Sequence, residues 1–417
     1  MQEIIRASRA AMASGGGARL VTIVDVEGSA FRSPGARLLI LPRQTIGTIS
    51  GGCLEAEVAE RALAAPADAL PAVWRYDTRV ADEALLGWGS GCGGAITLLV
   101  EELSAASQTI DFIADCHAAG EPAVVALIYE STDPAIARVG DRIHLRPPDL
   151  LSKRRDPRHA AAQPPDFFLG GNPAAAPRRS AGLRRIIQAD ARRILATQRW
   201  MSATYEIGSA EVRVLLEPIV PPIRLLICGI GEEARALSHL AKQLGWHVTL
   251  ADPRLDGARP IGDADRTLDC RPDELIAAAQ MPGEFAAVIM THRLLQDAEL
   301  LAELLPTRAR YIGVLGPQRR LQLLLDTLPG QKISPRQLAK IHGPAGLDIG
   351  GEMPAEIALS IAAEIAAVFA GRRGGMLRHR QRGLHAGPET FMESRAVLSP
   401  APGHGRPGSP QIRRVTS

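Results

Sequence analysis

Two glycine-rich stretches of the chain each hold a cysteine, SGGC at residues 50–53 and GCGG at residues 91–94. Glycines let a ligand approach the backbone, and a thiolate can bind a soft metal, carry sulfur or attack an electrophile. Cys53 begins a predicted helix, and the dipole at a helix start favours the thiolate form. Cys92 lies among glycines and a serine whose backbone N–H groups are open to a ligand. The candidate ligand contacts in the two stretches are Cys53, Cys92, Gly52, Gly91 and Gly93.

Neither cysteine has the partners of a zinc site or of a cysteine protease. Zinc needs about four ligands, yet neither C-x-x-C spacing nor a neighbouring histidine accompanies Cys53 or Cys92. No local signature supplies a catalytic base either. We therefore predict no metal site. The other cysteines lie in apolar or strand-like segments and are predicted to be small buried hydrophobes: Cys116, Cys228 and Cys270.

A loop between two predicted strands could supply a positive charge to the same site. Residues 27–40 read EGSAFRSPGARLLI and include Ser29 and Arg32. The Arg32 guanidinium could clamp an anion, or it could bond the carbonyl groups of its own loop, and both interpretations stay open. If one site is formed, Cys53 and Cys92 face a single cleft with Arg32 near its rim.

A dinucleotide-type turn lies in the second half of the chain. In CGIGEEARAL, Gly229, Gly231 and Ala234 match G-x-G-x-x-A between a predicted strand and a predicted helix. The glycines allow a tight turn, and the helix N-terminus can hold a phosphate. Asp252 ends the next predicted strand, where a carboxylate can bind ribose hydroxyls. This order predicts a Rossmann fold.

Two acidic residues in the same turn weaken the expectation of a bound nucleotide. Glu232 and Glu233 fall in the first helical turn, where they stabilise the positive helix end themselves and repel a pyrophosphate. The turn therefore either binds NAD(P) or is an inherited turn with weak or no nucleotide binding.

Other polar residues follow the ends of predicted parallel strands, the edge at which open α/β sheets bind ligands. Thr291 and His292 follow one strand, and His292 could contact a ligand or simply cap the next helix. Arg319 and Arg320 fall in a first helical turn, where cations oppose the dipole. They indicate an anionic partner, either a ligand or a carboxylate of the protein. Asp348 lies in a glycine-rich segment near the same edge.

Short apolar strands alternate with amphipathic helices in the second half of the chain. This pattern predicts an α/β fold with a doubly wound parallel sheet. The predicted strands are 224–229, 247–252, 286–291 and 310–316, and the predicted helices are 232–244, 273–280, 295–305, 318–328 and 354–371. In the first half we predict strands at 19–26, 36–42, 94–103, 122–130 and 211–217, and helices at 54–65, 107–119 and 183–199.

These elements divide the chain into four parts. Residues 1–102 form an N-terminal α/β cofactor module, and residues 103–219 form a middle segment. A Pro/Ala/Arg-rich insertion at 146–182 interrupts that segment. Residues 220–370 form a Rossmann-like domain, and residues 371–417 form a basic tail that its composition predicts to be disordered.

Composition and charge exclude several classes of protein. The chain of 417 residues is 46% hydrophobic and 22% charged, as ordinary globular proteins are. Its net charge of +3 is unevenly distributed. Residues 371–417 hold nine arginines, no lysine and two glutamates, so the tail carries +7 and the rest of the chain carries −4. No folded face for nucleic acid is therefore expected. We find no secretory signal and no apolar run long enough to span a membrane, so the cytoplasm is the expected compartment.

Taken together, the motifs resemble the XdhC/CoxI family, the accessory proteins of xanthine dehydrogenase and related molybdenum hydroxylases. They occur in one order and cover roughly residues 19–102 and 208–370. The segments that carry the resemblance are VEGSAFRSPGARLLI, GTISGGCLEAEV, GSGCGGAITLLVE, LADPR, MTH followed by Asp297, RYIGVLGPQRR and GLDIGGEMPAEIALSIAAEI.

The resemblance implies a chaperone that binds the molybdenum cofactor (molybdopterin) as cargo, protects it while a terminal oxygen is exchanged for sulfur, and delivers it to the apo-hydroxylase. The implied partners are a xanthine dehydrogenase-type molybdenum hydroxylase and a cysteine desulfurase, and the implied assembly is a homodimer. Cys92 matches the family's candidate cofactor contact, and Cys53 matches its other recurrent cysteine. This cofactor has a phosphate and a metal, which need N–H groups, an arginine and a soft ligand. These groups occur in residues 27–37, 50–53 and 90–94.

The second half of the chain departs from the family pattern in two places. The family often has histidine where this chain has Glu232, and it often reads T-H-D-H where this chain reads Thr291-His292-Arg293-Leu294. Both changes weaken the expectation of a cofactor or metal in the Rossmann-like part.

Two other functions stay open on the sequence. An NAD(P)-dependent oxidoreductase could use His292 and Asp297 for proton transfer, with Cys92 as an auxiliary. A scaffold protein could retain a vestigial pocket and recruit partners through the basic tail. The sequence does not decide whether the protein catalyses a reaction, although a non-enzymatic maturation factor fits the resemblance better.

Overall fold

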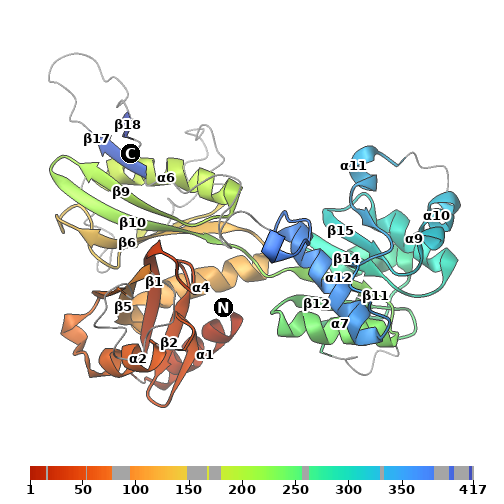
Figure 1. Cartoon of the computed structure of the whole chain (residues 1–417), viewed down its shortest axis with the longest axis horizontal. Coiled ribbons are helices and arrows are strands. Elements are labelled where there is room, and N and C mark those ends of the chain that lie inside the picture. The colour runs from red at the N-terminus through yellow and green to blue at the C-terminus, as the bar shows by residue number, and fades with distance from the viewer. Residues whose placement is uncertain are drawn as a thin grey trace. The chain divides into compact units, whose positions relative to one another are not determined.

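The chain forms two compact units, Met1–Val220 with Leu384–Ser417 and Pro221–Gly383 (Figure 1). Each unit has its own sheets and apolar cores. The computed structural model describes residues 1–15, 17–52, 54–77, 94–147, 167–168, 180–255, 263–328, 333–379, 394–398 and 413–415.

The first sheet of unit 1 is antiparallel, with the order β3-β2-β1-β5-β4 among its described strands. Its central strand β1 pairs with β2 on one side and with β5 on the other. The ladder with β5 runs from Arg19 opposite Glu102 to Gly28 opposite Gly94. The strands are β1 (Arg19–Gly28), β2 (Arg37–Leu41), β3 (Gln44–Gly47), β4 (Ala72–Asp77) and β5 (Gly94–Glu102).

Helices cover both faces of this sheet because each buries one apolar stripe. On one face, α2 (Glu55–Ala64) packs Val58 and Ala62 against inward residues of β1, β2 and β5. On the other face, α1 (Gln2–Ser14) and α4 (Leu103–Ala119) enclose a core with Leu20 and Leu39. The side chains of β1 thus alternate between apolar cores on the two faces of the sheet.

A second, mixed sheet completes unit 1, with the order β18-β17-β9-β10-β6-β7-β8. Helix α6 (Ser180–Thr197) covers one face of it, where Leu183 and Ile187 pack among residues such as Tyr205 and Val212. The strands are β6 (Ala123–Ser131), β7 (Arg142–Leu145), β8 (Phe167–Phe168), β9 (Met201–Ile207), β10 (Ala210–Ile219), β17 (Ser394–Leu398) and β18 (Arg413–Val415).

Several of these strands were not expected from the sequence. The apolar pattern predicted no strand at 201–207, where β9 pairs with β10. Strand β8 lies within the segment predicted as an insertion. Within the tail predicted to be disordered, residues 394–398 form β17, which pairs in parallel with β9, and 413–415 form β18. The physical reason is that the edge of β9 away from β10 can accept an extended segment, a tertiary effect that composition does not reveal.

Buried ion pairs join the two sheets of unit 1. Arg37 of β2 bonds Glu217 of β10 through both guanidinium Nη atoms, at 2.7 and 2.5 Å. The two side chains are only 3% and 10% exposed. A Cβ on Gly35 would lie 2.9 Å from Oε1 of Glu217, so glycine leaves room for the pair. Two further pairs between the sheets are Arg213 with Asp25 and Arg142 with Glu101.

The sheet of unit 2 is parallel, with the order β13-β12-β11-β14-β15-β16 among its described strands. Counted along the chain, this is the third, second, first, fourth, fifth and sixth strand, the order of dinucleotide-binding Rossmann folds. The predicted α/β fold with a Rossmann-like parallel sheet is confirmed. The strands are β11 (Arg224–Cys228), β12 (His247–Ala251), β13 (Arg266–Leu268), β14 (Phe285–Ile289), β15 (Ala309–Val314) and β16 (Ile341–His342).

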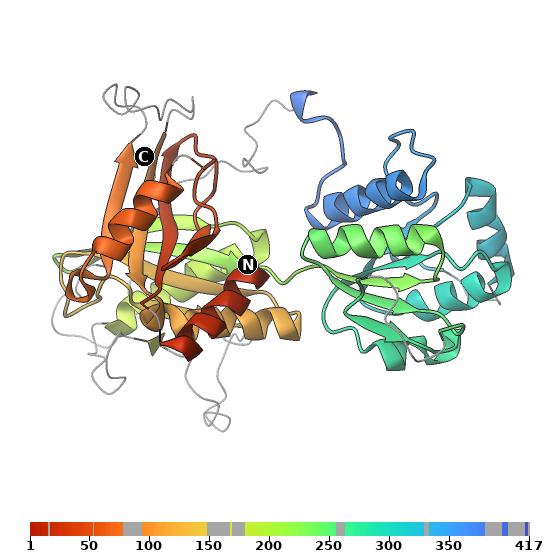
Figure 2. The same ribbon diagram turned by 90° about the horizontal axis from the view of Figure 1, so that it is seen from below.

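Helices lie on both faces of the parallel sheet (Figure 2). Leu225 and Ile227 of β11 face a core with α7 and α12, whereas Leu226 and Cys228 face a core with α8, α9 and α10. The helices are α7 (Glu232–Gln243), α8 (Leu275–Ala279), α9 (Leu294–Leu304), α10 (Gln318–Thr327), α11 (Pro335–Leu338) and α12 (Pro354–Phe369). The helix predicted at 273–280 is divided into a 3₁₀ turn at Pro272–Glu274 and α8.

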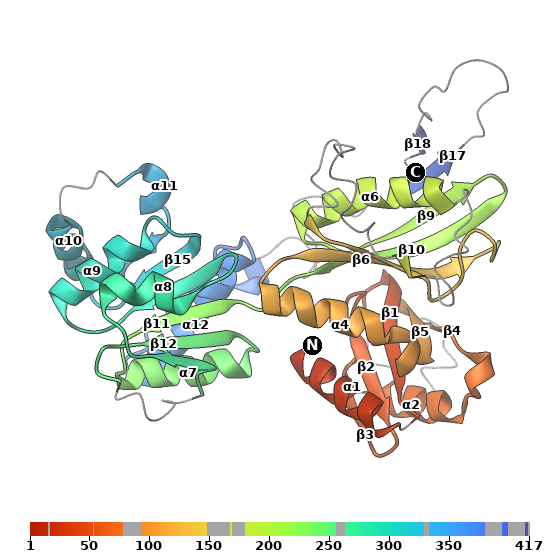
Figure 3. The same ribbon diagram turned by 180° about the vertical axis from the view of Figure 1, so that it is seen from behind.

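The helices of both units pack on sheets. Figure 3 shows α4 alongside β1 and β5, and α6 over β9 of the second sheet. In the described ranges, no helix is both long and apolar enough to cross a membrane.

Glu217→Ala tests the buried ion pair between the sheets of unit 1. The change leaves Arg37, 3% exposed, without its carboxylate partner. Breaking a buried pair in this way costs about 3–5 kcal/mol, so we expect the free energy of unfolding in urea to fall by that amount. The control Asp111→Ala removes half of the pair with Arg9, in which both side chains are 53% exposed, and should cost less than about 1 kcal/mol. Equal losses in the two variants would contradict the role of the buried pair.

Candidate functional site

Two loops of unit 1 and the start of β5 lie at one end of the first sheet. β1 ends at Gly28, and β5 begins opposite it at Gly94. A Cβ on Gly94 would lie 2.3 Å from the carbonyl oxygen of Ser29, so only glycine fits there. A Cβ on Gly51 would lie 3.7 Å from the ring of Phe31, which places the SGGC loop beside the loop after β1. The described ends of the three segments predicted to bind a ligand therefore lie together.

Three of the residues predicted to bind a ligand are described by the structure, and all three are exposed. Ser29, Arg32 and Gly52 all face solvent. Gly52 has a φ of +107°, which favours glycine, and a Cβ there would meet open space. The remaining predicted contacts, and with them the expectation of one cleft for both cysteines, lie outside the described residues: Cys53, Cys92, Gly91 and Gly93.

Arg32 is available to an anion. Within the described residues, no hydrogen bond or ion pair engages its guanidinium, so nothing there supports the interpretation that it bonds the carbonyls of its own loop. Next to it in the chain, the Phe31 side chain is 60% exposed. A free guanidinium and an uncovered ring in one loop suit a ligand that combines an anionic group with a flat ring.

Glu55, at the start of α2, holds the SGGC loop. Its carboxylate accepts hydrogen bonds from the N–H groups of Ile49, at 3.2 Å, and Ser50, at 2.9 Å. It also accepts one from the hydroxyl of Thr48, at 2.6 Å, and one from the hydroxyl of Ser50. Burial opposes ionisation of the group, but the hydrogen bonds from Ser50 and Thr48 prevail and lower the pKa of Glu55 to about 2.

Ser50 extends this network into the glycines. Its Oγ accepts hydrogen bonds from the N–H groups of Gly52, at 3.2 Å, and Leu54, at 3.1 Å. These N–H groups are therefore already occupied, and among the described residues of the turn Gly51 carries the backbone N–H that a ligand would find. Helix α2 begins at Glu55, two residues after Cys53, whereas the sequence pattern placed the helix start at the cysteine.

Glu55 was not among the functional residues predicted from the sequence. The signal for a carboxylate that closes a helix N-terminus is an acid three residues after a serine or threonine. Here the acid follows Ser50 by five residues, because the two glycines lengthen the turn.

In unit 2, the strand order reverses between β11 and β14, and the nucleotide turn lies at this point. Gly229 has a φ of +131°, and a Cβ there would lie 2.5 Å from the carbonyl oxygen of Met290. Nε2 of His292 lies 3.9 Å from a carboxylate oxygen of Glu233 and 3.9 Å from the position of a Cβ on Gly231. The nucleotide turn and the end of β14 thus approach one another, and a carboxylate oxygen of Glu233 lies near the His292 ring. Ala234 is buried against the sheet.

Asp252 is the acid expected to bind ribose, but its carboxylate already accepts hydrogen bonds from Arg254. The guanidinium donates from Nε at 2.7 Å and from Nη2 at 2.6 Å, and the backbone N–H of Arg254 donates at 2.9 Å. The Asp252 side chain is fully buried. A ribose would have to displace this bidentate pair, so the geometry favours the inherited turn over a bound nucleotide. NAD(P) binding stays a hypothesis.

The anionic partner of Arg320 is a carboxylate of the protein. Its Nη2 donates to Asp297 at 2.6 Å, and the Thr291 hydroxyl donates to the other oxygen of the same carboxylate. Asp297 is 1% exposed. With both oxygens engaged and buried, Asp297 is poorly placed for the proton transfer that an oxidoreductase would require of it. His292 is exposed and has a left-handed φ of +63°.

The glycine-rich segment before α12 is fixed by Glu364. Its carboxylate accepts hydrogen bonds from Tyr311 at 2.6 Å and from the N–H of Gly346 at 2.7 Å, and it lies 3.0 Å from Nδ1 of His342. Burial opposes ionisation, but the bonds from His342 and Tyr311 lower the pKa of Glu364. Asp348 beyond it is exposed.

The three cysteines predicted to be buried hydrophobes are confirmed as such: Cys116, Cys228 and Cys270 are buried and free. Burial raises the pKa of the Cys116 thiol to about 11 and raises the pKa of the other two thiols as well. They are neutral thiols at pH 7 and poor nucleophiles. Across the described residues, no group of three His, Cys, Asp or Glu side chains is arranged to hold a metal ion.

Comparison with family models matches both halves of the chain. Residues 225–365 match the model described as the XdhC Rossmann domain, and residues 11–77 match that of the XdhC and CoxI family.

Two bacterial proteins are similar over most of their length. The chain is 27% identical over 351 residues to a probable xanthine dehydrogenase subunit of Bacillus subtilis (strain 168), across 83% of this chain and 91% of that protein. It is 25% identical over 376 residues to the molybdenum cofactor insertion chaperone PaoD of Escherichia coli (strain K12), across 88% and 87%. A crystal structure described as a xanthine dehydrogenase from Bacillus halodurans has the same fold, with a TM-score of 0.66 at 24% identity over 88% of this chain and 96% of that one.

Glu55→Gln tests the carboxylate that holds the SGGC loop. The amide keeps the size of the side chain but loses the charge that strengthens its hydrogen bonds, so the free energy of unfolding at neutral pH should fall by about 1–3 kcal/mol. The pKa of Glu55 is about 2 in the folded protein against a usual 4.5. The contribution of the carboxylate is therefore complete above about pH 5 and is lost as the pH falls toward the folded pKa.

Urea unfolding of the wild type and the variant at neutral pH and at about pH 3 measures this change. The gap between the two proteins should shrink at the lower pH. Glu60→Gln, an exposed position of the same helix, serves as the control and should match the wild type. A gap independent of pH would argue against the assigned role of Glu55.

Two adjacent arginines provide a matched pair for the network at the end of β14. Arg320→Ala leaves the buried Asp297 unpaired and should lower the free energy of unfolding by about 3–5 kcal/mol. Arg319→Ala changes an exposed neighbour and should cost less than about 0.5 kcal/mol. Thermal and urea unfolding compare the two, and similar costs would rule out the pairing as the anchor of Asp297.

Proposed function

The chain belongs to the XdhC/CoxI family, and on this premise we propose that it is a maturation factor that binds the molybdenum cofactor and delivers it to a xanthine dehydrogenase-type hydroxylase. The observation that supports the proposal is that the described parts of the three glycine-bearing segments lie close together at one end of the first sheet. Gly94 lies against Ser29, and Gly51 lies against Phe31. The name of the Escherichia coli relative, a molybdenum cofactor insertion chaperone, supports this function, and the name of the Bacillus subtilis relative connects it with xanthine dehydrogenase.

Each part of the cofactor has a counterpart among these residues. The guanidinium of Arg32, which no described residue engages, suits the phosphate, and the exposed ring of Phe31 suits the flat pterin. In this proposal Cys92 is the soft ligand toward the molybdenum, Cys53 lies near it, and the glycines let the cofactor approach the backbone. The backbone contacts belong to Ser29, Gly52, Gly91 and Gly93.

Glu55 acts in this proposal as a positioning residue. Its carboxylate and Ser50 fix the backbone on either side of Gly51. A loop held in this way presents its free N–H without reorganising when the cargo arrives, and such preorganisation lowers the entropic cost of binding. A negative charge so near the loop also disfavours small anions that lack the cofactor's other contacts.

We extend the proposal to the cofactor's processing. The bound cofactor is protected while its terminal oxygen is replaced by sulfur from a cysteine desulfurase, and it is then passed to the apo-hydroxylase. The protein acts in the cytoplasm as a homodimer and catalyses no step itself. The carboxylates of unit 2 support a non-enzymatic role, because Asp252 and Asp297 are both buried in ion pairs with arginines.

Cys92→Ala tests the assignment of the soft ligand. We expect the variant, isolated from a host that makes the cofactor, to retain at least about tenfold less molybdenum and pterin than the wild type. Cys116→Ala is the control, because this thiol is buried and free in the same unit, and it should keep the wild-type content. Metal analysis and pterin fluorescence measure both parts of the cofactor. Unchanged retention in Cys92→Ala would remove this cysteine from the site.

A further inference from the structure

Two neighbouring cavities open at the amino edge of the parallel sheet in unit 2. Each has a volume of about 600 Å³, and they share the wall formed by Pro306, Thr307 and Arg308. This wall is the turn that leads into β15. The edge is the opposite one from the nucleotide turn, because β14 starts here and ends at that turn. The proposed function makes no use of these cavities.

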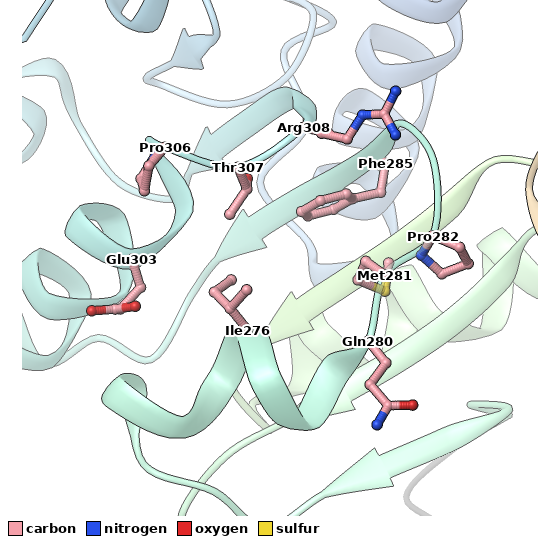
Figure 4. Close-up of a pocket in the computed structure, with 9 residues that line it drawn as sticks. All are labelled: Ile276, Gln280, Met281, Pro282, Phe285, Glu303, Pro306, Thr307 and Arg308. Carbon is pink, nitrogen blue, oxygen red and sulfur yellow. The ribbon is translucent and has the colours of Figure 1, made fainter.

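The first cavity is mainly apolar (Figure 4). Ile276 of α8 and Phe285 of β14 face one another across it, with Met281 beside them. Phe285 is 3% exposed and forms part of the core, so the floor is rigid. A cavity of this size and lining accepts a large aliphatic or aromatic side chain. The Glu303 carboxylate lies at one side of it, away from the Met281 wall.

The second cavity is cationic. Four basic side chains and one carboxylate, that of Glu284, line it. Glu284 bonds Arg310 at 3.3 Å, and Lys340 donates to the carbonyl oxygen of Thr307 at 2.9 Å. Arg308 and Arg336 are exposed, and among the described residues nothing pairs with either guanidinium. The basic residues are Arg308, Arg310, Arg336 and Lys340.

An apolar cavity beside unpaired guanidinium groups specifies a ligand with two adjoining features. In an extended segment, side chains two residues apart point to the same side about 7 Å from one another. Such a segment can insert an apolar side chain into the first cavity while a carboxylate two residues on reaches Arg308 and Arg336. Arginine forks recognise carboxylates in paired hydrogen bonds, and large apolar anchors dominate protein interfaces.

We propose that this edge of unit 2 is a docking site for a partner protein, through a segment in which a large apolar residue is followed by Asp or Glu. Charge complementarity selects this occupant: among its described lining residues the second cavity offers two free cations, and its carboxylate is already paired. The proposal is independent of the cofactor site and would hold for either outcome there.

Selection of peptides tests the proposal directly. A phage library of random dodecapeptides is panned on the full-length protein, and enriched sequences are synthesised with a fluorescein label. We expect the enriched peptides to carry a large apolar residue followed within a few positions by Asp or Glu. In fluorescence anisotropy, the double variant Arg308→Glu/Arg336→Glu should bind them at least about tenfold more weakly.

The matched control is Arg319→Glu, an exposed arginine of the same unit that lines neither cavity. It should bind the peptides as the wild type does, and thermal unfolding checks that all variants are folded. The proposal is overturned if no sequence is enriched, if the enriched peptides lack acidic residues, or if the double variant binds them unchanged. If no peptide is enriched but millimolar sodium decanoate raises the melting temperature of the wild type and not that of the double variant, the cavities belong to a small anionic amphiphile instead.

Discussion

The register of β1 against β5 is the constraint on which the candidate cofactor site depends. Gly28 faces Gly94, and the close approach of Gly94 to the Ser29 carbonyl admits no side chain. A shift by one residue would turn the inward side chains of β1 to the wrong core and would separate the loops. Packing between the sheets supports this register. The Arg37–Glu217 pair fixes β2, the neighbour of β1, to the second sheet. The site is thus a consequence of how unit 1 folds.

Carboxylates have contrasting roles in the two units. In unit 1, Glu55 is ionised by its hydrogen bonds and shapes a loop that presents the Gly51 N–H. In unit 2, the acids that a dehydrogenase would use, Asp252 and Asp297, are neutralised by Arg254 and Arg320. Unit 2 therefore has a Rossmann fold, but arginines of the protein itself already pair with the acids at its ligand-binding edge. Fold and site diverge in this unit, as they often do among Rossmann proteins.

Local periodicity in the sequence predicted most of the helices and strands. Helices α7 and α12 were placed within two residues, because an amphipathic stripe and a glycine or proline at the end are local signals. Strand β9 was missed, since its half-buried pattern acquires meaning only beside β10. The ion pair between Asp252 and Arg254 was also not predicted, because it depends on the conformation of one long side chain. The expectation that Cys53 and Cys92 face one cleft stays a prediction, because the structure describes residues beside both cysteines but neither cysteine itself.

The molybdenum and pterin content of the wild-type protein, isolated from a host that makes the cofactor, tests the central claim most directly. The account predicts that both are present together in stoichiometric amounts with the chain and that both are released when the protein is unfolded. Protein that carries neither, after isolation without oxygen or chelators from a host shown to contain the cofactor, would contradict it.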